Sequence, residues 1–311
     1  MSSELIHLPV LLEATLELLD PQPGESFIDC TVNGGGHSVG ILSCTSPTGH
    51  LLALDADIEA LHRARVRLAA HGPRVTYVHG NFRHLRAIAD DSGFPEVDGI
   101  LIDLGMSSFQ LGEATRGFAF GQEGPLDMRY DTASGQSAAD FLESATPEAI
   151  EQTLRQFGEE PQARRIAQAI ASRRQSEPIR TTRDLADLVA ATVKWRGRIH
   201  PATRTFQALR IAVNDELSAL TEALPQAIAL LRRGARLAVI SFHSLEDRIV
   251  KTGFARLAGQ AVAPTVLVMA PPPAPPALVR IITKRPIMAS DDERTGNPRS
   301  RSARLRVAEC L

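Results

Sequence analysis

Short apolar runs alternate with amphipathic stretches along most of the chain. Five of these runs are rich in strand-forming residues, at 26–29, 51–55, 75–79, 99–104 and 236–241. Candidate helices lie between the first four runs, at 38–44, 58–70 and 82–90. Each helix has about the length that a right-handed crossover between parallel strands requires. The alternation therefore predicts an α/β fold with a doubly wound parallel sheet.

A second subdomain is predicted between the fourth and fifth strands, because more than 130 residues separate Leu104 from Arg236. From Ala138 this stretch has helical periodicity, and residues 203–224 predict one long amphipathic helix. We expect a sheet domain in two parts, 1–135 and 213–311, and an inserted helical RNA-recognition subdomain at 136–212. A proline-rich connector (271–276) and closing strands at 278–283 and 304–309 complete the predicted elements.

The composition indicates a globular protein of a reducing compartment. The 311 residues are 43% hydrophobic and include three cysteines, Cys30, Cys44 and Cys310. None of the three lies in a C-x-x-C pair or has a histidine spaced to complete a zinc site, so we expect neither a disulfide framework nor a metal. The N-terminal residues lack a basic signal region, and no apolar run approaches the roughly 18 residues of a membrane span. We expect a cytoplasmic protein.

Charge is segregated along the chain although the formal net charge is only -2. Residues 1–62 contain no Lys or Arg, whereas residues 155–210 hold twelve basic and five acidic residues. Arginine binds phosphate bidentately and stacks on bases, so a nucleic-acid surface is one interpretation of this segment. Arg164, Arg165, Arg173 and Arg174 suit contacts with phosphates. The alternative is a solvated helical face that serves solubility.

Residues 27–38 predict a strand, a glycine-rich turn and the start of a helix. The turn Asn33-Gly34-Gly35-Gly36 lets a ligand approach the backbone closely. Twenty residues beyond Gly35 the second strand ends at Asp55, where a carboxylate can meet ribose hydroxyls. A dinucleotide fingerprint requires glycine where this chain has Asn33 and Ser38, which disfavours a nicotinamide cofactor. With Asp29 at the end of the first strand, the pattern resembles the S-adenosylmethionine site of Rossmann-like methyltransferases.

The absence of basic residues from the first 62 positions suits a cationic sulfonium, which favours acidic surroundings. The alternative is that the glycines only tighten a turn and that Asp55 caps the next helix. Phe82, after the third strand, either faces the adenine or belongs to the core.

Several longer blocks carry a specific resemblance. They are H-x-P-V-L-L-E at 7–13, the fourth strand and its continuation at 98–111, R-G-F-A-F at 116–120, G-P-L-D-M-R at 124–129, and the blocks at 199–217, 240–251 and 301–309. Together they resemble the bacterial 16S rRNA cytosine-N4 methyltransferase family, known as small-subunit rRNA methyltransferase H. The blocks are colinear and extend over most of the chain.

The resemblance implies a Rossmann-like class I S-adenosylmethionine-dependent fold with an inserted helical subdomain. It also implies methylation of the N4 amino group of a cytidine in the decoding centre of 16S rRNA, with the small ribosomal subunit as the partner and no metal. The cofactor-binding positions that it implies are Gly35, Gly36, His37, Asp55, Phe82, Asp103 and Gln110.

This chain departs from the family pattern in two places. Asn33 stands where the family has the first glycine of the turn, and Asn tolerates a positive φ better than most residues. The family's S-S-P-Q-L-D is Ser107-Ser108-Phe109-Gln110-Leu111-Gly112 here, so the proline before Gln110 and the aspartate after Leu111 are replaced.

The residue types are consistent with amino-group methylation, by elimination. Carbon-5 methylation of cytosine needs a cysteine nucleophile, and no cysteine has a suitable position. A catalytic lysine for ribose methylation is missing from the first four strand ends, because the only lysines are Lys194, Lys251 and Lys284. Asp103 is the best candidate for accepting the amino N–H, unless it contacts the cofactor instead.

Other polar residues have local interpretations beside functional ones. His243, just past the fifth strand, faces the site or is structural, and Ser244 with Asp247 reads as a capping box. His7 and Glu13 close over the cofactor or belong to local packing.

Two other functions stay open at this point. One is a noncatalytic RNA-binding or ribosome-assembly module, and the other is a small-molecule methyltransferase. The first predicts failure to bind S-adenosylmethionine, and the second predicts substrate binding that salt does not weaken.

Overall fold

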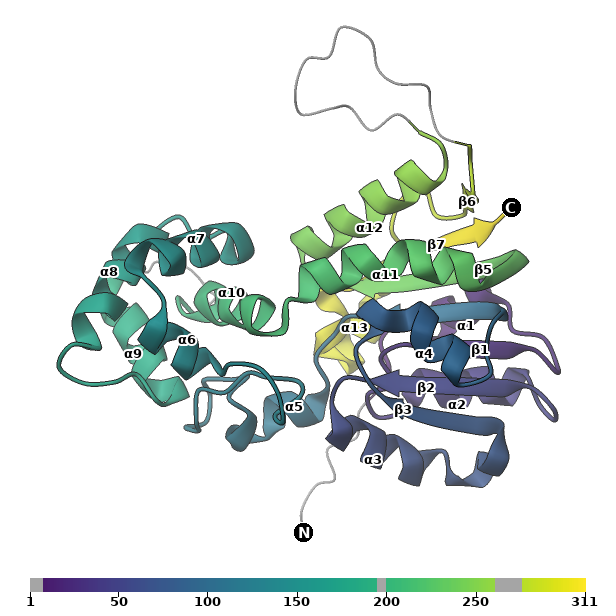
Figure 1. Cartoon of the computed structure of the whole chain (residues 1–311), viewed down its shortest axis with the longest axis horizontal. Coiled ribbons are helices and arrows are strands. Elements are labelled where there is room, and N and C mark those ends of the chain that lie inside the picture. The colour runs from purple at the N-terminus through teal and green to yellow at the C-terminus, as the bar shows by residue number, and fades with distance from the viewer. Residues whose placement is uncertain (1–7, 195–199, 261–275) are drawn as a thin grey trace, which may run out of the picture. The chain divides into compact units, whose positions relative to one another are not determined.

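The computed structural model describes residues 8–194, 200–260 and 276–311. The chain divides into two compact units, a helical unit at 106–216 and a sheet unit formed by 6–105 and 217–311 (Figure 1). The proline-rich connector at 271–276 lies almost entirely outside the described residues, as does His7.

The sheet unit contains one seven-stranded sheet among its described residues, with strand order β3-β2-β1-β4-β5-β7-β6. All strands are parallel except β7, which pairs antiparallel with both β5 and β6. The strands are β1 (Ser26–Asp29), β2 (His50–Asp55), β3 (Val75–His79), β4 (Val97–Asp103), β5 (Leu231–Ser241), β6 (Val279–Ile281) and β7 (Arg304–Cys310). The predicted doubly wound sheet is confirmed, and so are both closing strands.

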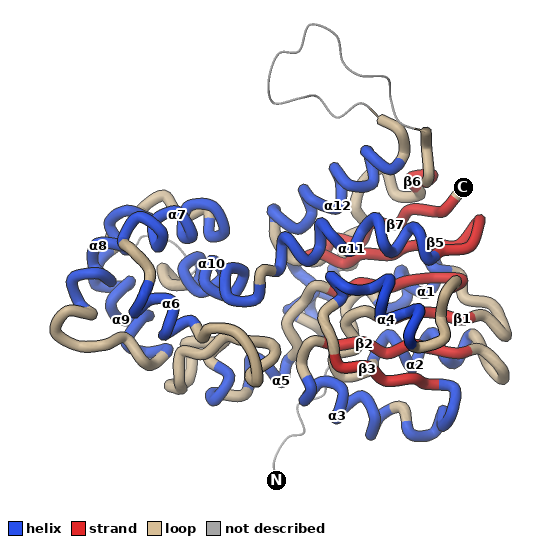
Figure 2. Tube along the Cα trace, viewed as in Figure 1, coloured by secondary structure: helices blue, strands red, loops and turns tan. Residues whose placement is uncertain are grey.

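Helices cover both faces of this sheet, because successive strand residues point to opposite sides (Figure 2). Ile28 and Ile100 belong to one buried cluster, whereas their neighbours Phe27 and Leu101 belong to the other. The helices of the unit are α1 (Leu12–Leu19), α2 (Gly36–Cys44), α3 (Ile58–Arg67), α4 (Leu85–Asp91), α11 (Glu216–Leu230), α12 (Ser244–Leu257) and α13 (Asp291–Gly296). No helix in the described ranges is long and apolar enough to cross a membrane.

The helical unit has its own core and begins earlier than the boundary expected at 136. Phe118, Leu126 and Met128 belong to the same buried cluster as the later helices, so the segment from Met106 packs with them. The helices are α5 (Ser108–Gly112), α6 (Ala138–Ser144), α7 (Pro147–Gly158), α8 (Ala163–Arg173), α9 (Thr182–Thr192) and α10 (Thr203–Asn214).

The long helix expected at 203–224 is wrong, because α10 and α11 are separate. Asp215 interrupts them in the left-handed conformation, with a φ of 48°. The preceding Asn214 is held from the side: its Nδ2 donates to Met128 O (2.7 Å) and its Oδ1 accepts from Tyr130 N (2.8 Å). These tertiary hydrogen bonds fix the break at a place where the apolar periodicity continues without interruption.

Candidate functional site

Three neighbouring strands each end in an aspartate. Asp29, Asp55 and Asp103 are the last residues of β1, β2 and β4, which are neighbours in the order β2-β1-β4, and all three are buried. Asp29 pairs in register with Ala53 and Leu101, so Asp55 and Asp103 each extend two residues further along. Carboxyl ends of parallel strands are where open α/β sheets bind ligands. The fold therefore gathers three carboxyl groups at one edge.

Backbone donors and hydroxyls fix the orientation of the first two carboxyl groups. Asp29 Oδ2 accepts from Ser38 Oγ (2.7 Å), and Asp55 accepts from the backbone N–H groups of Asn33 and Asp57 (both 2.9 Å). The helix that follows β2 is capped by Asp57, whose side chain accepts from Glu59 N. The alternative in which Asp55 caps that helix is therefore wrong.

Burial raises the pKa of both carboxyl groups. The pKa of Asp55 rises to about 7, although hydrogen bonds from Asp57 N and Asn33 N lower it. The pKa of Asp29 is also raised by burial, and the Ser38 hydroxyl opposes this shift. Both groups would be more easily ionised if a cation occupied the site.

The glycine-rich turn adopts the conformation that close approach to a ligand requires. Asn33 has a φ of 49° and Gly35 a φ of 74°, so the chain turns through left-handed backbone at both positions before α2 begins at Gly36. The expectation that Asn33 takes the positive φ of the missing glycine is confirmed. A Cβ on Gly36 would lie 3.0 Å from the ring of Pro9. Pro9 and its neighbours at 8–13, here called the N-terminal block, therefore pack against the turn.

His37 joins that N-terminal block to the strand ends. Its Nε2 lies 2.9 Å from Val10 O, and because a carbonyl oxygen can only accept, Nε2 carries the proton. Burial lowers the pKa of His37, so the ring is neutral near pH 7. Its Nδ1 lies 3.7 Å from Asp103 Oδ2, which is too long for a hydrogen bond.

Asp103 ends β4 with its backbone anchored and its carboxyl group lightly bonded. Its N–H donates to Thr31 Oγ1 (2.6 Å), whereas its Oδ1 accepts only a long bond from Gly105 N (3.4 Å) among the hydrogen bonds found for this carboxyl. Burial raises the pKa of Asp103 to about 7; the Gly105 bond and Arg299 lower it, and Glu246 raises it. A carboxyl group with this pKa can accept a proton near neutral pH.

The remaining two expected cofactor residues are placed less distinctively. Phe82 begins a short 3-10 helix after β3 and packs, half-buried, against the core, so the choice between core and adenine contact stays open. Gln110 belongs to the helical unit. Its side chain accepts from Ser107 N (2.9 Å) and completes a capping box at the start of α5.

Past the end of β5, His243 has the structural role that was one of its two interpretations, but Ser244 and Asp247 do not form the expected capping box. His243 itself is the N-cap of α12, and Glu246 is its capping-box partner. Asp247 is engaged elsewhere, in ion pairs with Arg304 (3.0 Å) and Arg306 (2.7 Å). Burial raises the pKa of Asp247, but the two arginines outweigh it and hold this pKa below its usual range.

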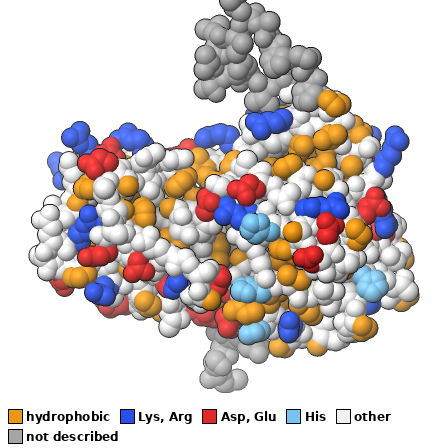
Figure 3. Space-filling model, viewed as in Figure 1, with side chains coloured by type: hydrophobic (Ala, Val, Ile, Leu, Met, Phe, Trp, Pro, Cys, Tyr) orange, Lys and Arg blue, Asp and Glu red, His pale blue; other side chains and the backbone are white. Residues whose placement is uncertain are grey.

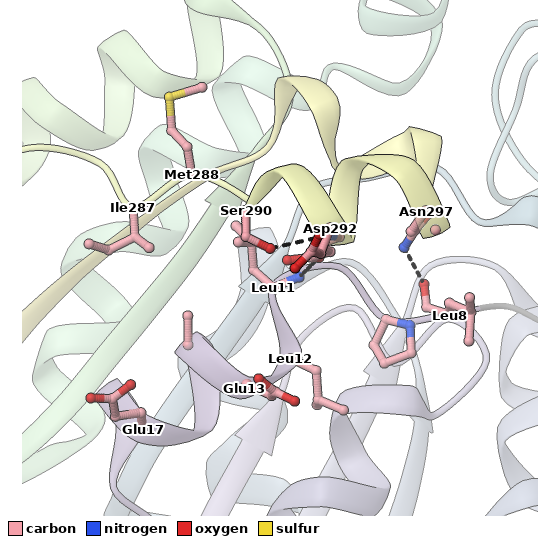
Figure 4. A pocket seen from close by; sticks show the side chains of 14 residues that line it. Leu8, Leu11, Leu12, Glu13, Glu17, Ile287, Met288, Ser290, Asp292 and Asn297 are labelled. Carbon is pink, nitrogen blue, oxygen red and sulfur yellow. Dashed lines mark hydrogen bonds between the residues drawn. The ribbon is translucent and has the colours of Figure 1, made fainter.

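The N-terminal block also borders an open groove of about 750 Å³ between α1 and α13 (Figure 4). Glu13 lines this groove together with other carboxylates, and no basic residue lines it. Leu11 N donates to Glu293 Oε1 (2.7 Å) and Asn297 Nδ2 donates to Leu8 O (3.3 Å), so α13 holds the block in place. Glu13 therefore lies on a groove wall. No hydrogen bond among the described residues joins it to Asp29, Asp55 or Asp103.

Two of the four arginines expected to meet phosphates are available on α8. Arg164 and Arg165 are exposed, and neither has a hydrogen-bond or ion-pair partner among the described residues. Arg173 forms an ion pair with Glu177 one turn away. Basic and acidic side chains are interspersed on the visible face of this unit (Figure 3).

Arg174 does not fit the expected role. Its Nη1 donates to the carbonyl oxygens of Leu142 and Ala145 (2.7 Å to Ala145), which lie at the carboxyl end of α6. Those carbonyls have no partner within the helix, so the guanidinium satisfies them. Arg174 is therefore a structural residue of the helical unit.

Sequence reasoning missed two residues beside Asp103. Thr31 follows β1 within the turn already singled out, so its position offered a signal. Arg299 lies in a 3-10 helix (Pro298–Ser302) almost two hundred residues further along, and its charge reaches Asp103 only through the fold. Nothing in the local sequence marks that contact.

The three carboxyl groups at the strand ends fit a cationic nucleoside. Three buried carboxyl groups with raised pKa values are unfavourable together and become favourable beside a positive charge. Each oxygen of Asp55 retains a lone pair for a ribose hydroxyl. The sheet order and this site define a Rossmann-like class I methyltransferase that uses S-adenosylmethionine.

Comparison with known sequences gives the particular family. The sequence pattern of the MraW methylase family matches residues 4–311, and the chain belongs to this family. It is 51% identical to Ribosomal RNA small subunit methyltransferase H of Thermomicrobium roseum, over 97% of this chain and 93% of the relative. The proteins of the same name from Heliobacterium modesticaldum (49%; 97% and 98% covered) and Syntrophotalea carbinolica (50%; 98% of each) are similarly related.

Proposed function

We propose that this protein methylates the N4 amino group of one cytidine in the decoding centre of 16S rRNA, in the P-site region at position 1402. The observation that carries the proposal is a sequence identity of about 50%, over nearly the whole chain, with proteins named Ribosomal RNA small subunit methyltransferase H. The cysteines agree with an amino-group target. Burial raises the pKa of Cys30 well above its usual value, so the cysteine nearest the strand ends is a poor nucleophile for carbon-5 chemistry.

In this proposal the cofactor is held by Gly35, Gly36, His37, Asp55, Phe82, Asp103 and Gln110. When bound, S-adenosylmethionine supplies an electrophilic methyl group on a positively charged sulfur. Asp55 accepts hydrogen bonds from the ribose hydroxyls, and Gly35 lets the backbone approach the ligand. The neutral ring of His37 keeps the N-terminal block against the turn through Val10 without adding a positive charge beside a cation.

Asp103 is the proposed catalytic residue. The lone pair of a cytosine amino group is delocalised into the ring, and a carboxylate that accepts one N–H bond makes the nitrogen more nucleophilic. On methylation the amino nitrogen would lose a proton, and Asp103, whose pKa is about 7 in the free protein, could accept it. The Thr31 hydroxyl fixes the backbone of Asp103 in position for this role.

The helical unit is proposed to hold the RNA through exposed arginines such as Arg164 and Arg165. We further propose that the substrate form is the small ribosomal subunit, that the reaction requires no metal, and that it takes place in the cytoplasm. The target base must leave its stack to reach the cofactor, which costs less in irregular RNA than in a helix.

Methyl transfer to small subunits tests the function directly. Purified protein, radiolabelled S-adenosylmethionine and subunits that lack the modification should give N4-methylcytidine at a single position, identified by nuclease digestion and mass spectrometry. Label at carbon 5 or on ribose would contradict the proposed chemistry. Transfer to a small molecule but not to subunits or free 16S rRNA would favour the alternative methyltransferase function.

Arg164 and Arg174 offer a matched test of the RNA-binding face. The double variant Arg164→Ala/Arg165→Ala should bind RNA more weakly and should lower the slope of log affinity against log salt by about 1 to 2, because up to two phosphate contacts are lost. Arg174→Ala should leave that slope unchanged but destabilise the protein by about 1 to 3 kcal/mol, because two helix-terminal carbonyls lose their donor. Filter binding at several salt concentrations and chemical denaturation separate the two effects. Equal slopes for wild type and the double variant would remove these two arginines from the RNA interface.

A further inference from the structure

The sheet unit contains a second cavity, of about 440 Å³, on the flank formed by α12 and the last strands. One wall comes from α12, with Lys251 and Phe254, and the other from β6 and the residues after it, with Thr283 and Lys284. Arg306 of β7 closes the cavity from inside the sheet. The helix and strand walls lie side by side in the fold (Figure 1).

This cavity is lined by four basic residues and no acidic one: Lys251, Arg280, Lys284 and Arg306. Two of the four have counter-charges behind the wall, because Arg306 pairs with Asp247 (2.7 Å) and Arg280 with Glu309 (2.6 Å). Lys251 and Lys284 have no hydrogen-bond or ion-pair partner in the described ranges 8–194, 200–260 and 276–311. The cavity therefore has a surplus of about two positive charges near neutral pH.

A buried hydroxyl adds a directional donor. Thr283 is 6% exposed and lines the cavity, and its Oγ1 accepts a hydrogen bond from Val307 N (2.8 Å). With one lone pair used in this way, the hydroxyl proton remains to be donated. Two ammonium groups and one hydroxyl donor form a set that complements the oxygens of a phosphate group.

We propose that this cavity binds a backbone phosphate of the RNA substrate, at a site separate from the cofactor site and from the helical unit. The assignment to RNA rests on the proposed function, whereas the affinity for a phosphate group rests on the lining alone. The strand direction supports an RNA track. Since β6 runs parallel to β5, Thr283 and Lys284 extend toward the sheet edge where β4 delivers Asp103.

A second groove of the same unit has the opposite charge. The groove between α1 and α13 is lined by Glu13, Glu17, Asp292 and Glu293 and by no basic residue, so it repels RNA (Figure 4). The surplus of positive charge thus distinguishes the cavity beside α12 from the groove between α1 and α13. The two lysines of the cavity are also two of the three lysines in the whole chain.

The test compares the double variant Lys251→Ala/Lys284→Ala with Arg256→Ala. Arg256 is exposed on the same helix α12 but does not line the cavity, so its variant removes a positive charge from the same neighbourhood. The probe is a single-stranded RNA of about 20 nucleotides and arbitrary sequence, because backbone binding does not depend on a target cytidine. S-adenosylmethionine binding, measured for each variant, reports that the cofactor site is intact.

We expect the lysine variant to bind the RNA about tenfold more weakly at low salt and to lose about 0.7 from the slope of log affinity against log salt, the value for one neutralised phosphate of a single strand. Arg256→Ala should retain the wild-type slope. Titration with uridine monophosphate and with inorganic phosphate distinguishes the two sources of a phosphate group. Weak, lysine-dependent binding of both supports a backbone site.

An unchanged RNA slope in the lysine variant would overturn the proposal, and so would tight lysine-dependent binding of the mononucleotide with no effect on RNA. Methyl transfer by the wild type to ribosomal subunits is scored separately. If the wild type does not methylate subunits but still binds RNA through the two lysines, the proposed function is rejected and the phosphate site is retained.

Discussion

Asp103→Asn is expected to lower the rate of methyl transfer by about 100- to 1,000-fold while the protein stays folded, in line with the usual contribution of a single proton acceptor. Asparagine keeps the size of the side chain, but it has no negative charge and accepts a proton poorly. The backbone anchor to Thr31 is unaffected, because the N–H of residue 103 makes that bond. Single-turnover transfer at saturating cofactor and subunits measures the effect.

Asp98→Asn is the matched control for this experiment. Asp98 lies near the start of the same strand, where it accepts from Ser26 N (2.8 Å) and pairs with Arg232 (2.9 Å), so the substitution removes a carboxylate away from the strand ends. Its transfer rate should stay within about twofold of wild type. If Asp103→Asn recovers the wild-type rate once cofactor is saturating, Asp103 only binds the cofactor and its catalytic assignment is wrong.

The strands of this protein could be predicted closely because each is a short apolar run between polar turns. β1 and β3 match their predicted bounds, and the other strands differ by a few residues at their ends. The break between α10 and α11 could not be predicted in this way. Its cause is a side-chain contact from Asn214 to a loop more than eighty residues earlier, and the local periodicity carries no trace of such a contact.

The candidate site shows the same division between local and long-range causes. The aspartates at strand ends follow from sequence position, because a parallel sheet gathers its carboxyl ends at one edge. The roles of Asp247 and Arg174 were mistaken because their partners, Arg306 and the end of α6, are distant in sequence. Whether an arginine binds phosphate or caps a helix depends on which carbonyls the fold brings near it.

The affinity for S-adenosylmethionine is expected to increase with pH between 6 and 8. Asp55 and Asp103 both have pKa values of about 7 in the free protein, so at pH 6 they are mostly protonated and at pH 8 mostly ionised. A bound cation favours the ionised forms, and binding at pH 6 must therefore release protons. The dissociation constant should be about tenfold higher at pH 6 than at pH 8 for each carboxyl group ionised on binding.

The free protein should show the opposite trend in stability. A carboxyl group whose folded-state pKa is raised from 3.8 to about 7 keeps a proton that the unfolded chain releases. Its stabilising contribution is complete below pH 4 and is lost as the pH rises through 7. The melting temperature without cofactor should therefore fall between pH 5 and 8, and saturating cofactor should reduce that fall.

S-adenosylhomocysteine separates the two carboxyl groups in this experiment. It has the same nucleoside but a neutral sulfur, so it keeps the ribose contact with Asp55 and loses the attraction between the sulfonium and Asp103. Calorimetric titrations of wild type and Asp103→Asn with the same ligand cancel the ligand's own titration. The pH dependence that S-adenosylmethionine shows in excess of S-adenosylhomocysteine should disappear in Asp103→Asn. Burial lowers the pKa of His37, which reduces any opposing dependence from this ring. If the affinities of the two ligands depend equally on pH in the wild type, the sulfonium does not lie beside Asp103. The proposed place of Asp103 between cofactor and cytosine would then have to be abandoned.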